Sequence, residues 1–330
     1  MKVTEATITV TNRCNLRCQI CDIWQIRDNH LLLPEDYHKL PSTLTQINLE
    51  GGEPFLRKDL LEIIEVLKSR CPKAGIKITT NGVLTRVIEE KVKRMPEVVL
   101  MISINGPEKV HDRISGVKGA YQKGIETIKR LKSLGIRDLS IRATASKLNQ
   151  ETFFEVKKLA DQFEIGFNCG LHNLPEITFG DQKDLLPHPP SIKKELEKTR
   201  DSYLKKFKPE EWLRAYFVEG LIDSVEGRPR AIRCTAGSNS FFLQPNGDIY
   251  PCKVLNLKMG NIKEGGIEEI MENSEHIKET VKLCPHQCWM SSNMTPLFKR
   301  NPIKPLCWAL SHKFKFELLK FLGNSTNGNK

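Results

Sequence analysis

The chain has 330 residues, enough for one large domain or two smaller ones, and its 51 basic and 40 acidic residues give a formal net charge of +11. No apolar run approaches the ~20 residues that cross a bilayer, and no secretory signal precedes the first strand-like segment, so we expect a cytoplasmic protein. Clustered cysteines in that reducing compartment are more often metal ligands than disulfides. No nucleic-acid-binding module is recognisable, and we expect no nucleic-acid partner.

Short β-like runs alternate with helical stretches through the first half of the chain. We predict six strands, at residues 4–10, 46–50, 75–80, 98–104, 139–145 and 165–169. We predict helices at residues 34–39, 58–69, 87–93, 119–134 and 150–162, the last of them capped by Asn149. This alternation indicates a parallel sheet with right-handed crossovers, so the predicted fold over residues 1–182 is an α/β barrel or partial barrel.

The pattern changes after the predicted barrel. Residues 183–232 contain a proline-rich joint followed by charged, helical sequence, which predicts a helical linker. In residues 233–297, Pro245-Asn246-Gly247 separates two strand-like runs and predicts a β-hairpin. Residues 298–330 form a basic tail, because from Lys299 onward seven basic residues face one acidic residue. We therefore expect a barrel, a linker, a small hairpin and helix extension, and a tail.

The tail contains a candidate amphipathic helix at residues 311–322. Phe314, Leu318 and Phe321 share one face of that helix, with lysines around them. Packing against the barrel is the simpler interpretation. The alternative is peripheral contact with an anionic membrane surface, which would favour a lipid-linked substrate.

Three cysteines, Cys14, Cys18 and Cys21, lie within eight residues directly after the first predicted strand. Three soft thiolates at this spacing can hold three corners of a cubane iron–sulfur cluster, which normally takes four cysteines. The iron without a protein ligand is then open, as in metal centres that carry out chemistry. A zinc site, completed by Asp22 or a remote histidine, and a disulfide remain alternatives.

The second predicted strand runs into a glycine turn, Gly51-Gly52-Glu53-Pro54. Two glycines allow the backbone to approach a ligand closely, and the Glu53 carboxylate can accept a hydrogen bond from an amine. The turn alone is a weak signal. In combination with the cysteine loop one strand earlier, the turn becomes a specific signal.

Together the two motifs resemble those of the radical S-adenosylmethionine (radical SAM) superfamily. The resemblance covers roughly residues 4–180 and continues through Thr80-Asn81-Gly82, residues 102–106 and His111-Asp112-Arg113. It implies a partial (β/α)6 barrel. It also implies a [4Fe–4S] cluster on the three cysteines, whose open iron takes the amine and carboxylate of S-adenosylmethionine (SAM).

The resemblance further implies the protein contacts of SAM. Gly51, Gly52 and Glu53 would meet the amine, and Ser103 and Arg142 would meet the ribose and carboxylate. Asn81 is a candidate by position only. A salt bridge in the barrel wall is the alternative role for Arg142.

The chain departs from the family pattern next to the third cysteine. Ile20 stands where the family often has an aromatic residue that packs toward the adenine, and Trp24 is a candidate to supply that ring. Candidate substrate contacts, each with a structural role as the favoured alternative, are Cys169, His111, His172 and Asn173.

A second cysteine group lies in the extension and comprises Cys234, Cys252, Cys284 and Cys288. The predicted hairpin can bring the first two together, and a closed site of four thiolates holds zinc or a complete iron–sulfur cluster. The group resembles the twitch form of the SPASM extension, which implies an auxiliary [4Fe–4S] cluster. The last two cysteines are spaced CxxxC instead of the usual CxxC, so His286 and Cys307 are alternatives to Cys288.

The resemblance implies an enzyme that reductively cleaves SAM to a 5′-deoxyadenosyl radical, which abstracts hydrogen from a substrate. A reductant such as flavodoxin or ferredoxin would supply the electron, and the auxiliary cluster could support a net oxidation. We expect a small-molecule, sugar or lipid-linked substrate, because only about three residues precede the first strand and leave no space for a leader-peptide recognition domain. The alternatives are a ribosomal-peptide maturase of the same superfamily, a non-catalytic iron–sulfur redox protein and a zinc-organised binding protein.

Overall fold

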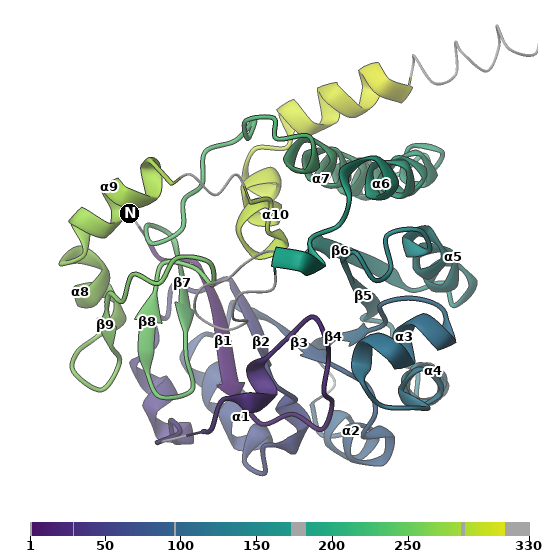
Figure 1. Cartoon of the computed structure of the whole chain (residues 1–330). Coiled ribbons are helices and arrows are strands. Elements are labelled where there is room, and N and C mark those ends of the chain that lie inside the picture. The colour runs from purple at the N-terminus through teal and green to yellow at the C-terminus, as the bar shows by residue number, and fades with distance from the viewer. Residues whose placement is uncertain (1, 29, 96, 173–182, 285–287, 314–330) are drawn as a thin grey trace, which may run out of the picture.

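One continuous sheet of nine strands, in the order β6-β5-β4-β3-β2-β1-β7-β8-β9, organises the fold (Figure 1). The structure is a computed structural model that describes residues 2–28, 30–95, 97–172, 183–284 and 288–313. The first six strands are parallel and follow one another in chain order, which confirms the predicted parallel sheet; they are β1 (Glu5–Thr11), β2 (Gln46–Gly51), β3 (Gly75–Thr80), β4 (Val98–Ser103), β5 (Leu139–Ala145) and β6 (Gly166–Leu171).

Helices cover the outer face of these six strands (Figure 1). They are α1 (Leu60–Arg70), α2 (Thr85–Val92), α3 (Glu108–Ser115), α4 (Ala120–Ser133) and α5 (Phe153–Gln162). In α1, Leu60, Ile63, Ile64 and Leu67 recur at helical spacing and are buried in the core. Short 3-10 helices lie in the connections at η1 (Ile23–Gln25), η2 (Pro34–Lys39), η3 (Pro54–Leu56) and η4 (Lys183–Leu185).

The strands alternate between two environments. Apolar residues such as Ile8, Leu49 and Ile141 point to the helices and are fully buried. Polar residues occupy the alternate positions, which face the inside of the barrel; they include Thr7, Thr9, Asn48, Glu50, Lys77, Thr79, Ser103, Arg142 and Thr144. A parallel sheet that is packed on both faces normally reads as a continuous apolar run. The alternation therefore marks a polar interior that is suited to ligands.

The predicted helix at residues 34–39 is confirmed as the 3-10 helix η2, in which Pro34 begins a segment of six residues and the Asp36 carboxylate accepts a hydrogen bond from the Leu33 amide. Two other local expectations were wrong. Helix α3 was not predicted, although Gly116, left-handed with φ of 68°, ends it in the usual way. Asn149 does not cap α5, whose N-cap is Thr152. The Asn149 side-chain amide instead donates to the carbonyls of Asn105 and Thr144 and so connects the segments after β4 and β5.

The C-terminal part continues the barrel sheet. It contains α6 (Pro189–Leu204), α7 (Pro209–Val225), β7 (Ser240–Leu243), β8 (Asp248–Tyr250), β9 (Gly260–Asn261), α8 (Ile267–Glu272), α9 (Glu275–Lys282) and α10 (Ser291–Arg300). The predicted hairpin is confirmed, since β7 and β8 are antiparallel around Pro245–Gly247. Strand β7 also pairs in parallel with β1, a contact between segments far apart in the sequence that local patterns do not predict.

The end of the chain is only partly described. Residues 303–313 are helical. Most of the predicted helix at 311–322, together with Asn173 and His286, lies outside the described residues. No described helix combines the length and the apolar character that crossing a bilayer requires.

Candidate active site

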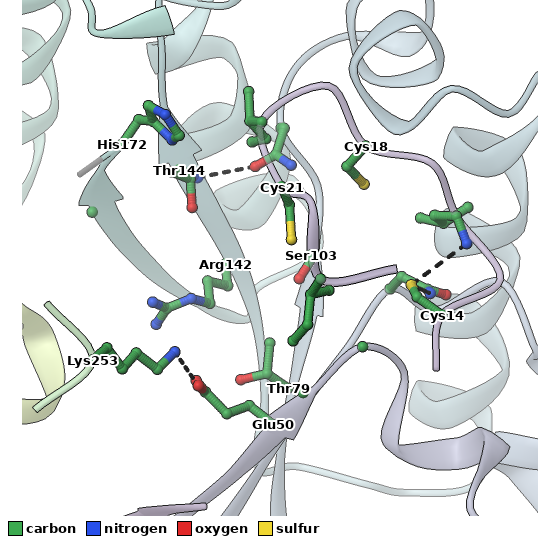
Figure 2. A pocket seen from close by; sticks show the side chains of 18 of the residues that line it. Cys14, Cys18, Cys21, Glu50, Thr79, Ser103, Arg142, Thr144, His172 and Lys253 are labelled. Carbon is green, nitrogen blue, oxygen red and sulfur yellow. Dashed lines mark hydrogen bonds and ion pairs between the residues drawn. The ribbon is translucent and has the colours of Figure 1, made fainter. Parts of the chain in front are cut away.

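A cavity of about 250 Å³ lies at the carboxyl ends of the barrel strands, where parallel α/β folds place their chemistry. Its wall brings together most of the predicted residues: Cys14, Cys18, Cys21, Gly51, Gly52, Asn81, Ser103 and Arg142. Figure 2 shows Arg142, Lys253 and Glu50 across this space from Cys14 and Cys18. One cavity therefore joins the predicted metal ligands to the predicted SAM contacts.

The cysteine loop is held at both sides. At the end of β1, the Asp28 carboxylate accepts hydrogen bonds from the Asn12 amide, at 2.6 Å, and from the Thr11 hydroxyl. Farther along, the Arg17 and Gln19 amides donate to carbonyls at the end of α3, at 3.0 and 2.8 Å. The cysteine loop is therefore anchored at β1 and at α3. These two anchors hold its thiols in the cavity wall.

The three thiols fit an iron–sulfur cluster by their chemistry. Burial and the neighbouring thiols raise the pKa of Cys18 to about 12, burial raises that of Cys21 to about 12, and burial also raises that of Cys14. A bound cation reverses this preference for the protonated form, because thiolates coordinate metal. All ten cysteines are free thiols, so the disulfide alternative is wrong. Among the described residues no three His, Cys, Asp or Glu side chains stand ready for a single metal ion, and the zinc alternative gains no support.

The glycine turn packs against the backbone of the cysteine loop. The Gly52 amide donates to the Thr11 carbonyl at 2.8 Å, and the Glu53 amide donates to the Arg13 carbonyl at 2.8 Å. A Cβ atom on Gly51 would lie 2.3 Å from the Thr11 oxygen, and one on Gly52 would lie 2.2 Å from the Arg13 oxygen. Both glycines are thus required for the close approach of the glycine turn to the cysteine loop. Both also line the cavity.

The expectation for the Glu53 side chain was wrong. Its carboxylate is fully buried, does not line the cavity and accepts hydrogen bonds from the Thr80 hydroxyl at 2.7 Å, the Asn81 amide at 2.8 Å and the Phe55 amide at 3.1 Å. Burial raises the pKa of Glu53 to about 7 in spite of these three donors. Glu53 therefore fastens the glycine turn to the end of β3, and its carboxylate is not placed to meet an amine in the cavity.

The other three predicted SAM contacts lie in the cavity wall. Asn81 donates to the Asn15 side chain at 2.7 Å and approaches the Cys14 sulfur at 3.9 Å. Ser103 and Arg142 are register partners on β4 and β5. The Arg142 guanidinium donates to the Ser291 hydroxyl at 3.4 Å, and within the described part of the chain it forms no ion pair, so the salt-bridge alternative gains no support.

Residues of the C-terminal extension that the sequence did not indicate complete the cavity, among them Lys253 and Trp289. Lys253 reaches into it and forms an ion pair with Glu50 at the end of β2 (Figure 2). Trp289 forms another part of the wall, and its indole donates to the Phe217 carbonyl at 2.8 Å. They follow Cys252 and Cys288 directly in the sequence, so the second cysteine group and the cavity share a boundary. The available signal was the polar position of Glu50 on β2, a strand on which only Ile47 and Leu49 are buried.

The expected replacement for the missing aromatic residue was wrong. Trp24 does not line the cavity, because its ring packs under the Arg17 guanidinium at 4.9 Å. Ile20 and Ile23 form that part of the wall instead. Cys169 is buried in the core outside this cavity, as its apolar surroundings favoured.

The second cysteine group also comes together. Cys234, Cys252 and Cys284 pack around one small cluster of buried apolar residues. Burial, then Cys252, Cys234 and Cys284, raise the pKa of the Cys288 thiol to about 12, so the other three cysteines act electrostatically on Cys288. Cys307 is exposed and contributes to none of these shifts. The four predicted thiols thus form a soft donor set that fits a complete iron–sulfur cluster.

The packing of the glycine turn leads to a testable expectation for Gly52→Ala. The new methyl group forces the turn and the cysteine loop apart, which costs about 1–3 kcal/mol as overpacking and displaces Cys14. We expect lower thermal stability and a loss of iron from the N-terminal site. Iron analysis and thermal melting measure both effects. Gly266→Ala is the matched control, because a Cβ atom there meets nothing within 4 Å; equal losses in both variants would contradict the explanation.

Comparisons with known proteins agree with this geometry. The Radical SAM superfamily profile matches residues 8–161, and the profile of an iron–sulfur cluster-binding domain, SPASM, matches residues 234–308. Similar relatives include proteins named probable GTP 3′,8-cyclase from Saccharolobus solfataricus, 28% identical over 80% of this chain and 90% of the relative, and from Sulfurisphaera tokodaii, 28% identical over 85% and 89%.

Solved structures of similar fold include anSMEcpe with bound AdoMet, at a TM-score of 0.65, 17% identity and coverage of 98% of this chain and 99% of that one. Another is SuiB of Streptococcus suis bound to S-adenosylmethionine, at a TM-score of 0.62, 16% identity and coverage of 82% of this chain but only 65% of SuiB. SAM and iron–sulfur clusters are the cofactors of this chain. The chain is an enzyme that belongs to the radical SAM superfamily and carries a SPASM-type cluster-binding domain.

Proposed function

We propose that Cys14, Cys18 and Cys21 hold the [4Fe–4S] cluster that binds SAM, and that the enzyme uses it to abstract hydrogen from a small-molecule substrate. The observation that carries the proposal is the single cavity that the three thiols share with the glycine turn, Ser103 and Arg142. When bound, the cluster and SAM supply a 5′-deoxyadenosyl radical. The residues of this chain bind and orient the ligands and exclude water.

Each part of the cavity wall has a role in this proposal. Gly51 and Gly52 offer backbone atoms to the methionine amine, and the Arg142 guanidinium, steadied by Ser291, attracts the carboxylate. Ser103 lies beside Arg142 in the β4–β5 register and supplies a hydroxyl to the ribose. Asn81 steadies the cysteine loop through Asn15 and in this way positions Cys14.

The Lys253–Glu50 pair supports a polar small-molecule substrate. The pair, together with Thr79, Arg142, Met290 and Ser291, also borders a second cavity of about 230 Å³. Arg142 adds a cation to this shared wall and the Lys253–Glu50 pair adds hydrogen-bonding groups, so the wall favours a substrate with an anionic or hydrogen-bonding group, such as a phosphorylated sugar or nucleotide. GTP is therefore the first candidate to test, because relatives with 28% identity are named probable GTP 3′,8-cyclase. A peptide substrate remains the alternative, since relatives of the same fold include SuiB bound to a precursor peptide.

The proposal extends to the rest of the chain. Residues 1–182 would be the barrel, 183–232 the linker, 233–297 the auxiliary domain and 298–330 the tail. Cys234, Cys252, Cys284 and Cys288 would hold an auxiliary [4Fe–4S] cluster that accepts the substrate electron in a net oxidation. Flavodoxin or ferredoxin would reduce the enzyme in the cytoplasm. The basic tail would add peripheral membrane contact, which cosedimentation with anionic vesicles tests.

The experiment that tests the core of the proposal is anaerobic reconstitution with iron and sulfide, reduction with dithionite and measurement of 5′-deoxyadenosine from SAM, first alone and then with GTP. Release of 5′-deoxyadenosine by the loaded enzyme supports the proposal, and faster release with GTP supports the nucleotide substrate. Fully loaded enzyme that forms no 5′-deoxyadenosine above background would overturn it.

Arg142 provides a separate test of the SAM site. Replacing it by alanine removes a charged hydrogen-bond donor, an interaction of about 1.5–3 kcal/mol, so we expect SAM to bind about 10- to 150-fold more weakly. Equilibrium dialysis of the oxidised, cluster-loaded protein measures this without turnover. Arg94→Ala is the control, because Arg94 is exposed after α2 and does not line the cavity. Unchanged SAM affinity in Arg142→Ala would remove Arg142 from the site.

A further inference from the structure

His111 is a buried histidine in the cavity wall whose hydrogen bonding is half complete. It lies on α3, and its side chain is only 2% exposed. The Asn105 amide donates to His111 Nδ1 at 3.0 Å, so Nδ1 is the acceptor and the ring proton lies on Nε2. Burial lowers the pKa of His111 to about 4, which keeps the ring neutral. Its Nε2–H is therefore a fixed, uncharged donor.

This donor has no protein acceptor. Among the described residues no hydrogen-bond partner reaches His111 Nε2, although the atom is shielded from water. Buried donors in folded proteins are nearly always satisfied, because an unpaired one forfeits the hydrogen bond that it made with water. The ring is also held in place, edge to face against Tyr121 with centroids 6.1 Å apart. Because His111 lines the ligand cavity, its rigid, unpaired donor is most simply explained by an acceptor on the ligand.

The position of His111 indicates which part of the ligand is concerned. The end of α3 accepts backbone hydrogen bonds from the cysteine loop, and Leu16, Cys18 and Ile20 of that loop line the same cavity. His111 lies on α3, the helix that follows β4 in the chain, and β4 ends at Ser103, which the proposed function assigns to the ribose. The glycine turn assigned to the methionine amine follows β2, two strands away. His111 is thus on the nucleoside side of the proposed SAM site.

We propose that His111 donates its Nε2–H to an acceptor atom of the nucleoside half of SAM and so positions that half against the cysteine loop. This inference rests on the proposed function, because it requires SAM in this cavity. It makes His111 a binding and positioning residue, and it explains why a neutral imidazole is kept where water cannot satisfy it.

Two variants separate ligand binding from support of the loop. His111→Asn places an amide oxygen near the position of Nδ1, so it can keep the bond from Asn105 but loses the donor to the cavity. His111→Gln extends to the position of Nε2, so it can keep the cavity donor but loses the acceptor for Asn105. Binding of SAM, 5′-deoxyadenosine and methionine to the oxidised, cluster-loaded enzyme is measured by equilibrium dialysis, and thermal melting is recorded for each variant.

We expect His111→Asn to bind SAM and 5′-deoxyadenosine about five- to tenfold more weakly, with methionine binding unchanged, and His111→Gln to stay within about twofold of the wild type. The reverse order, with His111→Gln the weaker binder, would show a merely structural role and overturn the inference. Unchanged SAM binding in both variants would also overturn it. Wild-type enzyme that carries its cluster but binds no SAM would instead contradict the proposed function.

Discussion

Replacement of Cys14, Cys18 and Cys21 together by alanine is expected to reduce SAM cleavage to the background rate. The change removes every protein ligand of the proposed N-terminal cluster. The distal thiols do not line this cavity and stay intact. The iron content should therefore fall from roughly eight to roughly four atoms per chain. Iron analysis and quantification of 5′-deoxyadenosine check the two results on the same protein sample.

Two further variants make this test specific. Cys307→Ala should change neither iron content nor SAM cleavage, because Cys307 is exposed and apart from both cysteine groups. Cys252→Ala should lower iron by roughly four atoms and leave the N-terminal cluster loaded. A triple variant that retains about eight irons, or that loses all of its iron while still folded, would disprove the division into two independent clusters.

The second large effect is expected at Gly220, inside α7. A Cβ atom there would lie 1.9 Å from Cε2 of Trp289, whose ring is 4% exposed and packs against Phe217 and Phe298. Alanine normally favours a helix interior over glycine by about 1 kcal/mol. Displacing a buried indole costs about 3 kcal/mol or more, so the steric effect wins. We expect Gly220→Ala to melt at a lower temperature and to lose iron from the distal site, because Trp289 directly follows Cys288.

A double variant identifies the cause of that loss. In a Trp289→Leu background the obstacle is smaller, so the additional cost of Gly220→Ala should nearly vanish or change sign, as expected for residues in direct contact. Urea unfolding of the wild type, the two single variants and the double variant gives the coupling free energy. Additive effects would mean that the Trp289 ring is not what Gly220 accommodates.

Much of the barrel could be predicted because its signals are local. Short strand-like runs alternate with helical stretches along the sequence, and this alternation predicts β1 to β6. Three cysteines within eight residues mark the cysteine loop. The predicted position of the Glu53 carboxylate was wrong for a physical reason. A carboxylate in a turn can face a ligand or the protein, and only the position of the Thr80 and Asn81 donors decides between them.

The residues that were missed depend on contacts between distant segments. Lys253 enters the cavity because the β7–β8 hairpin is joined to β1, and nothing near Lys253 in the sequence encodes that pairing. Trp289 reaches the wall because α7 provides a glycine where the indole lies. The unpaired donor of His111 could not be predicted from the sequence either. Only the structure shows which of the two ring nitrogens accepts the hydrogen bond from Asn105.

The pairing of β1 with β7 has a consequence for biosynthesis. Thr4 and Asn239, at the start of this pairing, are 235 residues apart. At a translation rate of about 5–20 residues per second, one side of β1 stays without its partner for roughly 12–47 s after it leaves the ribosome. An unpaired strand edge invites association with other chains. The nascent enzyme is therefore most exposed to aggregation before its cluster-binding extension has been made, and chaperone dependence should be set by that interval.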